Sequence, residues 1–254
     1  MLLPRIIPCL LIKDNALYKT IAFDNPKYIG DPINAVRIFN EKKVDELIVL
    51  DISASVKGQE PNINLISDLA SECRMPLCYG GGIKNINQIQ KIISLGVEKV
   101  SISSAAINNC DILKGASDIV GNQSIVVTID VKKIQNEFIA YINNGTINTG
   151  KNIVELIEKF QNNGVGEIVI NSIDNDGLMN GFNFDLINKT IEFANIPLTF
   201  IGGAGSLNDI KLLFKKFGLV GAGVGSLFIF KGPYRAVLIN YPSRKDKEEI
   251  YSIT

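Results

Sequence analysis

Two stretches of the sequence follow one plan: MPLCYGGGIKNINQIQKIISLGVEKVSISSAA at residues 75–106 and IPLTFIGGAGSLNDIKLLFKKFGLVGAGVGSLF at residues 196–228. In each, a proline precedes a short apolar run, a glycine cluster, an amphipathic segment and a second apolar run. Pro76 and Pro197 are 121 positions apart, and VDELIVLDIS and VGEIVINSID repeat at the same offset. The beginning of the chain, RIIPCLLIKD, pairs with SIVVTIDVKK near Ser124. The repeat indicates that the chain consists of two similar halves.

Short β-branched runs alternate with amphipathic segments along the whole chain, which is typical of parallel βαβ units. No linker rich in proline or serine interrupts the pattern. We therefore predict an α/β fold, a single (β/α)8 TIM barrel over residues 1–254, with half-barrels at about 1–120 and 121–240 and a tail at 241–254. The expected strands span 5–11, 46–52, 76–80, 98–103, 124–130, 166–172, 197–202 and 219–225, and the expected helices include 32–43, 85–95, 152–161 and 207–216.

The composition narrows the class of protein. Lys+Arg and Asp+Glu balance at 26 each, so the chain has no overall charge that would attract nucleic acid or an anionic membrane. The apolar runs are too short to cross a bilayer, and the beginning of the chain lacks a signal-peptide pattern. We expect a cytoplasmic protein without nucleic-acid or membrane partners.

The sequence contains no histidine, which excludes every catalytic scheme that relies on imidazole. Proton transfer must then use Asp, Glu, Lys, Tyr or Cys. The four cysteines show no CxxC spacing, and a zinc site without histidine is disfavoured. We expect no metal and no other cofactor.

Glycine clusters follow one predicted strand in each half, and hydroxyl-bearing residues follow the next strand. Glycine lets backbone N–H groups approach an anion closely, and barrels bind phosphate at such strand ends. A tight turn would explain one cluster alone, but two clusters in register favour a ligand with a phosphate at each end. The candidate phosphate-binding residues are Gly81, Gly82, Ser103 and Ser104 in the first half, and Gly202, Gly203, Gly225 and Ser226 in the second.

Six motifs in order carry a family likeness over essentially the whole chain: RIIPCL, DELIVLDI, YGGGI, GVEKVSISSAA, INSIDNDG and GGAG. They resemble the cyclase subunit of imidazole glycerol phosphate synthase, HisF. The resemblance implies a barrel that receives ammonia from a separate HisH-like glutaminase. It also implies that ammonia travels along the barrel axis to a bis-phosphorylated substrate, where two aspartates act as acid and base.

The resemblance breaks at one of these aspartates. Asp130 matches the family, but Leu11 stands at the corresponding place in the first half. Leucine cannot donate or accept a proton, and acid–base catalysis typically contributes about 10²–10⁴ in rate. The cyclase chemistry is therefore expected to be compromised, unless Asp130 alone suffices.

Other positions keep the family pattern. Lys19 is expected to contact phosphate and serve the chemistry at the mouth, although a solvated loop lysine would have the same sequence. The resemblance further assigns substrate binding to Asp51, Asp176 and Gly177, which match the family pattern. It also assigns substrate binding to two phosphate positions at which Ser103 and Asn171 replace other polar residues of the family.

Charged residues begin four of the predicted strands, at the end of the barrel opposite the glycine loops. In the family, four such residues form a salt-bridged ring that gates ammonia entry, although ordinary ion pairs at the barrel bottom are the alternative. Glu98 matches a position that docks the glutaminase. The gate residues are Arg5, Glu46, Lys99 and Glu167.

Leu11, the opening PRIIPCLLI and the later FKGPYRAVLINYPSR are similar to a side branch of the family, the HisF-like acetamidino-modification proteins of surface-sugar biosynthesis. This resemblance implies work with a HisH-like glutaminase and a sugar amidotransferase. Two alternatives stay open: a true cyclase subunit of histidine biosynthesis, and a non-catalytic scaffold that binds a phosphorylated small molecule and activates a glutaminase.

Overall fold

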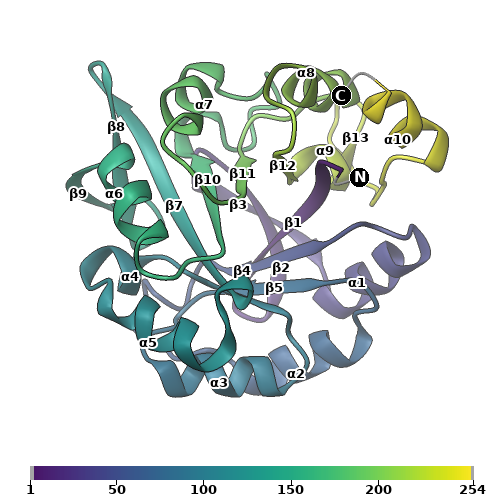
Figure 1. Cartoon of the computed structure of the whole chain (residues 1–254). Helices are drawn as coiled ribbons and strands as arrows, with labels where there is room; N and C mark the ends of the chain where they lie inside the picture. The colour runs from purple at the N-terminus through teal and green to yellow at the C-terminus, as the bar shows by residue number, and fades with distance from the viewer. Residues whose placement is uncertain (1–2, 253–254) are drawn as a thin grey trace.

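The computed structural model describes residues 3–252, and eight parallel strands form a closed barrel at its centre (Figure 1). The strands follow the chain order around the barrel, and pairing of the fifth with the sixth completes the circle. The predicted TIM barrel is confirmed. Its strands are β1 (Arg5–Lys13), β4 (Leu47–Asp51), β5 (Leu77–Gly80), β6 (Lys99–Ile102), β7 (Ile125–Ile134), β10 (Glu167–Ser172), β11 (Leu198–Ile201) and β12 (Gly221–Val224).

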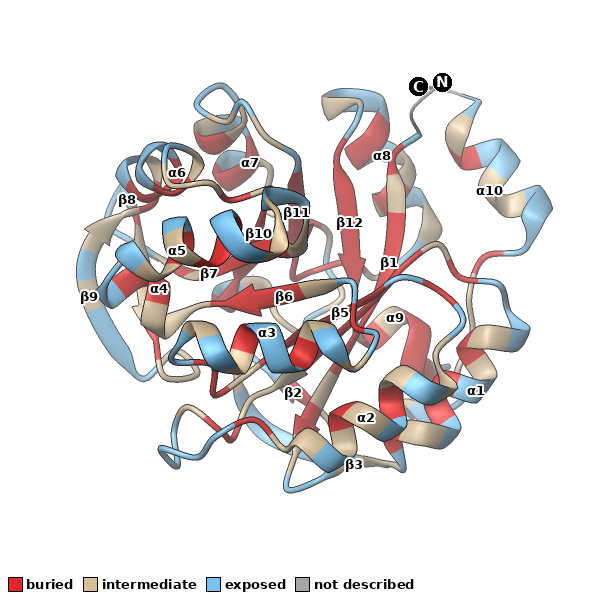
Figure 2. Cartoon of the chain, turned by 60° about the horizontal axis from the view of Figure 1, so that its bottom comes forward, coloured by how far each residue is buried: buried red, intermediate tan, exposed pale blue. Residues whose placement is uncertain are grey.

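Helices surround the barrel and bury their apolar faces against it, while their outer faces stay exposed (Figure 2). Most of them begin at a side chain that accepts a backbone N–H of the first turn, such as Asp31, and Ser206 forms a reciprocal capping box with Asp209. The helices are α1 (Pro32–Glu41), α2 (Ile63–Glu72), α3 (Ile86–Ser94), α4 (Ser104–Asn108), α5 (Asp111–Val120), α6 (Ile153–Gln161), α7 (Phe184–Ile191), α8 (Leu207–Phe217) and α9 (Ser226–Ile229).

Alternate residues of the strands belong to two separate apolar clusters. The larger cluster fills the space between strands and helices, and the smaller one fills the barrel interior. Because side chains of a strand alternate between its two faces, this division fixes which residues face the interior. The interior cluster comprises Ile7, Cys9, Ile48, Cys78, Val126, Val169 and Ile201, with Leu11 and Leu50 packed against it.

Two hairpins extend the barrel beyond the predicted pattern, one after β1 and one after β7. The first consists of β2 (Ala16–Ile21) and β3 (Asp24–Gly30), and the second of β8 (Glu137–Ile142) and β9 (Ile147–Asn152). The two hairpins follow equivalent strands of the two halves, so they are part of the internal repeat. The second hairpin had a readable signal, since Asn-Asn-Gly at 143–145 separates two alternating runs.

The tail returns to the N-terminal end of the barrel. After the short strands β13 (Phe230–Lys231) and β14 (Ala236–Val237), the Tyr241 hydroxyl donates to the Ile6 carbonyl at 2.9 Å. The last helix, α10 (Arg244–Tyr251), contributes Lys247, which pairs with Asp45 at 2.8 Å. Residues 253–254 of the predicted tail lie outside the described residues. Within residues 3–252, no helix has the length and apolar character to cross a bilayer.

Candidate functional site

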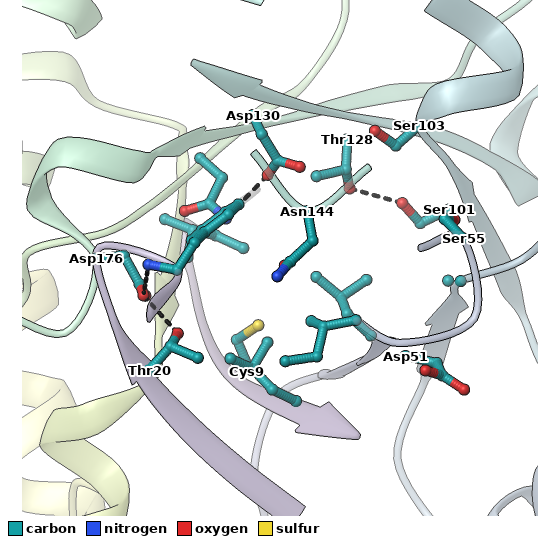
Figure 3. Close-up of a pocket in the computed structure, with 18 of the residues that line it drawn as sticks. Cys9, Thr20, Asp51, Ser55, Ser101, Ser103, Thr128, Asp130, Asn144 and Asp176 are labelled. Carbon is teal, nitrogen blue, oxygen red and sulfur yellow. Dashed lines mark hydrogen bonds between the residues drawn. The ribbon is translucent and has the colours of Figure 1, made fainter. Parts of the chain in front are cut away.

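A pocket with a volume of about 340 Å³ opens at the C-terminal ends of the barrel strands (Figure 3). It brings together every residue that the sequence placed at the mouth, from both halves of the chain. These residues are Leu11, Lys19, Asp51, Gly81, Gly82, Ser103, Ser104, Asp130, Asn171, Asp176, Gly177, Gly202, Gly203, Gly225 and Ser226.

The glycine loops of the two halves have matching backbones. Gly81 has φ of 126° and Gly202 has φ of 101°, values that residues with a side chain rarely adopt. A Cβ atom on Gly81 would lie 2.5 Å from the Asp51 carbonyl oxygen, and one on Gly202 would lie 2.7 Å from that of Ser172. Both loops therefore require glycine for close packing of backbone on backbone, at equivalent places beside the pocket.

The next strand end also has the same geometry in each half. Ser103 precedes α4 with φ −121° and ψ −88°, and Gly225 precedes α9 with φ −96° and ψ −90°. Neither helix has a side-chain cap at its beginning. The pocket thus presents two equivalent sets of glycine loop and hydroxyl, which is the arrangement expected for a ligand with two anionic ends.

Lys19 is buried in β2, so the solvated loop lysine is excluded. Its Nζ donates to the Cys9 carbonyl at 2.5 Å and lies 2.9 Å from where a Cβ on Gly225 would stand. Burial lowers the pKa of Lys19, although the negative charge of Asp176 opposes this shift. The Lys19 amino group is therefore held directly against the second glycine–hydroxyl set.

Asp130 and Asn171 face the pocket from neighbouring strands. β7 and β10 pair them side by side, and the Asn171 Nδ2 donates to the Asp130 Oδ1 at 3.1 Å. Burial raises the pKa of Asp130 to about 7; the Asn171 hydrogen bond lowers it and the charge of Asp176 raises it. Near neutral pH, Asp130 can thus either give or take a proton.

The equivalent pair in the first half is apolar. β1 and β4 pair Leu11 with Leu50, in the same register that β7 and β10 use for Asp130 and Asn171. Figure 3 shows Asp130 and Thr128 on one side of the pocket and Cys9, which is on the strand of Leu11, on the other. The mouth therefore has one polar and one apolar side.

Three of the predicted substrate residues also hold the local structure. The Asp176 carboxylate accepts from the Thr20 hydroxyl at 2.6 Å and from the Phe23 N–H at 3.3 Å, which ties the first hairpin to the mouth. Gly177 leaves no room for a Cβ, which would lie 2.1 Å from the Thr20 carbonyl oxygen. Asp51 Oδ1 accepts three hydrogen bonds from the turn at 53–54, so this oxygen is committed to the loop.

Sequence reasoning missed several polar residues of the pocket. The Ser101 and Thr128 hydroxyls bond to each other at 2.6 Å on the interior side, and Asn144 reaches over the opening from the second hairpin (Figure 3). The half-barrel repeat could have found Thr128, because it is the counterpart of Cys9. Asn144 could not be identified in this way, because it lies in a hairpin that was not predicted.

The opposite end of the barrel carries a closed ring of ion pairs. Arg5 lies 2.6 Å from Glu46 and 2.7 Å from Glu167, and Lys99 lies 2.7 Å and 2.9 Å from the same two carboxylates. Glu46 and Glu167 are only 4% and 5% exposed, so they depend on both cations. The predicted ring geometry is present, and its gating role stays a prediction.

Glu98 stands next to this ring and is exposed. Its Oε2 accepts from the Leu77 N–H at 2.7 Å, so one carboxylate oxygen is committed to the barrel. Its docking role stays a prediction.

The raised pKa of Asp130 gives a test of its environment. The unfolded chain ionises Asp130 near pH 3.9 and the folded chain near pH 7, so the free energy of unfolding falls as pH rises through this window. We expect Asp130→Asn to be more stable than the wild type at pH 8, by about 2 kcal/mol, and little different at pH 4. Urea unfolding at both pH values measures this, with the exposed Asp118→Asn as control. A less stable Asp130→Asn at pH 8 would contradict an unfavourable burial of the ionised carboxylate.

Comparison of the chain with known proteins identifies its family. A family described as "Histidine biosynthesis protein" matches residues 5–234. The "Putative imidazole glycerol phosphate synthase subunit HisF" of Leptospira borgpetersenii is 53% identical over 253 residues, covering 99% of this chain and 100% of that protein. The "Imidazole glycerol phosphate synthase subunit HisF" of Natranaerobius thermophilus is 38% identical over 248 residues, covering 98% and 99%. The chain belongs to the HisF family, the cyclase subunits of imidazole glycerol phosphate synthase.

Proposed function

We propose that this chain accepts ammonia from a HisH-like glutaminase and passes it through the barrel for acetamidino modification, the amidation of a surface sugar such as a nonulosonate. The observation that carries the proposal is the contrast between the two ends of the barrel. The ion-pair ring retains all four charged residues, whereas the mouth has Asp130 on one side and Leu11 on the other. We assign the handling of ammonia to the ring, whereas two-sided acid–base chemistry needs the residue that is missing at the mouth.

The proposal assigns each face a partner. The glutaminase docks at the N-terminal face, around the ring and Glu98. A phosphorylated small molecule occupies the two glycine–hydroxyl sets of the pocket, and a sugar amidotransferase takes up the ammonia. We place this complex in the cytoplasm.

A cyclase subunit of histidine biosynthesis is the second candidate. Two observations favour it: both glycine loops line one pocket, and the pKa of Asp130 near 7 suits a group that both donates and accepts protons. In this case Asp130 would do alone what the family shares between two aspartates.

Complementation distinguishes the two candidates. We expect that a histidine-requiring strain without its own HisF fails to grow without histidine when it produces this chain. Abundant ammonium in the medium removes the need for a matching glutaminase, and the HisF of Natranaerobius thermophilus serves as the positive control. Growth equal to that control, with this chain present in soluble form in both cases, would favour the histidine pathway and refute the amidation proposal.

A further inference from the structure

Asn171 has an unsatisfied oxygen inside the barrel. Among the described residues, its Oδ1 is the buried side-chain N or O atom without a hydrogen-bond partner, and the residue is 5% exposed. Its Nδ2 donates to the Asp130 Oδ1 at 3.1 Å. When Asp130 is ionised its carboxylate only accepts, so the amide turns its nitrogen toward Asp130, which leaves Oδ1 as the free end in that form. Buried carbonyl oxygens rarely lack a donor, so this atom indicates a ligand that brings one.

The neighbouring groups define what that ligand offers. Asp130 and Asn171 lie side by side on β7 and β10, and both line the pocket. Their free oxygens are acceptors, and Asp130 adds a negative charge when it is ionised. The charge of Asp176 also acts on Asp130 and has the same sign. The other charged residues that line the pocket are Asp51, Lys84 and Lys19, whose Nζ is bonded to the Cys9 carbonyl. A donor with positive charge therefore fits better than a neutral hydroxyl.

We propose that the Asp130 carboxylate and the Asn171 Oδ1 together bind a small nitrogen cation through its N–H groups, either ammonium or an amidinium. Two oxygens on adjacent strands suit such a donor, because charge-assisted hydrogen bonds to paired acceptors are the strongest that side chains make. The apolar Leu11–Leu50 pair takes the equivalent place in the other half, so only one side of the mouth offers this site. The inference rests on the proposed function for the source of the nitrogen, and on the geometry alone for the site.

The test measures how these cations affect Asp130. Full-length protein with ¹³C-labelled aspartate carboxyls is titrated by NMR in ammonium chloride, acetamidinium chloride or sodium chloride of equal concentration. Binding to the ionised carboxylate lowers its pKa. We expect ammonium or acetamidinium, or both, to lower the apparent pKa of Asp130 by about one unit relative to sodium, which corresponds to a tenfold preference for the ionised form. An effect of ammonium alone would identify free ammonia as the source, and an effect of acetamidinium would identify the amidine group.

Variants separate the site from general electrostatics. In Asn171→Leu the cation-specific shift should fall at least about threefold, because one of the two acceptors is lost. Asn171→Thr, whose hydroxyl can accept, should keep part of it and serves if the leucine variant does not fold. Thr190→Val removes a buried hydroxyl of α7 that lies outside the pocket and bonds to the Leu186 carbonyl, and it should keep the full shift. Equal shifts in sodium and in both nitrogen cations, or an unchanged shift in both Asn171 variants, would overturn the proposal. Imidazole formation by this chain would refute the proposed function and leave this result untouched.

Discussion

Replacement of Lys99 by methionine is expected to cost about 3–5 kcal/mol of unfolding free energy at pH 8. Lys99 pairs with Glu46 and Glu167, and both carboxylates are almost fully buried. Burial alone would lower the pKa of Lys99, but these carboxylates raise it above its ordinary value. Without Lys99, two buried negative charges depend on Arg5 alone, and an uncompensated buried charge is strongly unfavourable.

The loss should depend on pH in a defined direction. Burial opposes ionisation of Glu167, but Arg5 and Lys99 hold its pKa below the ordinary value in the folded chain. The variant removes one of these cations, so a ring carboxylate binds a proton more readily when folded than when unfolded. The destabilisation should therefore be smallest near pH 4 and grow as pH rises through about 4.3.

Matched variants identify the ring as the cause. Lys133 pairs with the exposed Asp185 at 3.3 Å, so Lys133→Met should change the unfolding free energy by less than about 1 kcal/mol. The double variant Lys99→Met, Glu46→Gln also removes one of the two buried negative charges. It should therefore recover part of the lost unfolding free energy. Urea unfolding at pH 5 and pH 8 measures all three. Equal stability of Lys99→Met and Lys133→Met at pH 8 would show that the buried carboxylates of the ring do not need Lys99 for stability.

Replacement of Gly203 by alanine is expected to disrupt the second glycine loop. Gly203 has φ of 104°, and its Cβ would lie 2.0 Å from the Gly181 carbonyl oxygen. The Gly181 N–H donates to the Gly203 carbonyl at 2.8 Å, so the two segments are hydrogen-bonded and cannot separate freely. We expect a loss of about 2–4 kcal/mol in unfolding free energy and at least about tenfold weaker binding of inorganic phosphate.

Gly232→Ala is the matched control for this variant. Gly232 also has a positive φ, of 72°, but a Cβ there meets no atom within 4 Å. Its alanine variant should lose about 1–2 kcal/mol of unfolding free energy, from the backbone conformation alone. It should bind phosphate like the wild type. Calorimetric titration with phosphate distinguishes the two. Wild-type phosphate affinity in a folded Gly203→Ala variant would mean that this loop does not hold an anion.

The sequence could predict the barrel because its repeat and its strand periodicity are local signals. The strand expected at 98–103 is observed at Lys99–Ile102, and the one expected at 219–225 at Gly221–Val224. β7 differs: it extends from the expected end at 130 to Ile134, because its last residues pair with β8. The pairing partner belongs to a hairpin that the helix-and-strand alternation does not reveal.

The site could be predicted in part for the same reason. The glycine loops recur at fixed offsets, and so do Glu46 and Glu167, so the repeat indicates them. Arg5 and Lys99 have no charged counterpart in the other half and depend on the family resemblance. The bond between Asn171 and Asp130 joins residues 41 positions apart and exists only in one strand register, which hydrophobic periodicity alone does not specify. The burial of Lys19 likewise depends on the first hairpin folding over the mouth.

We propose that this chain has kept the handling of ammonia and has lost the cyclase chemistry. The direct measurement supplies purified chain with ammonium and the bis-phosphorylated intermediate of the histidine pathway, and follows imidazole formation beside the HisF of Natranaerobius thermophilus. We predict binding of the phosphorylated compound, because both glycine–hydroxyl sets are present, with turnover at least about 100-fold below that control. Turnover at the rate of the control would contradict the loss of cyclase chemistry.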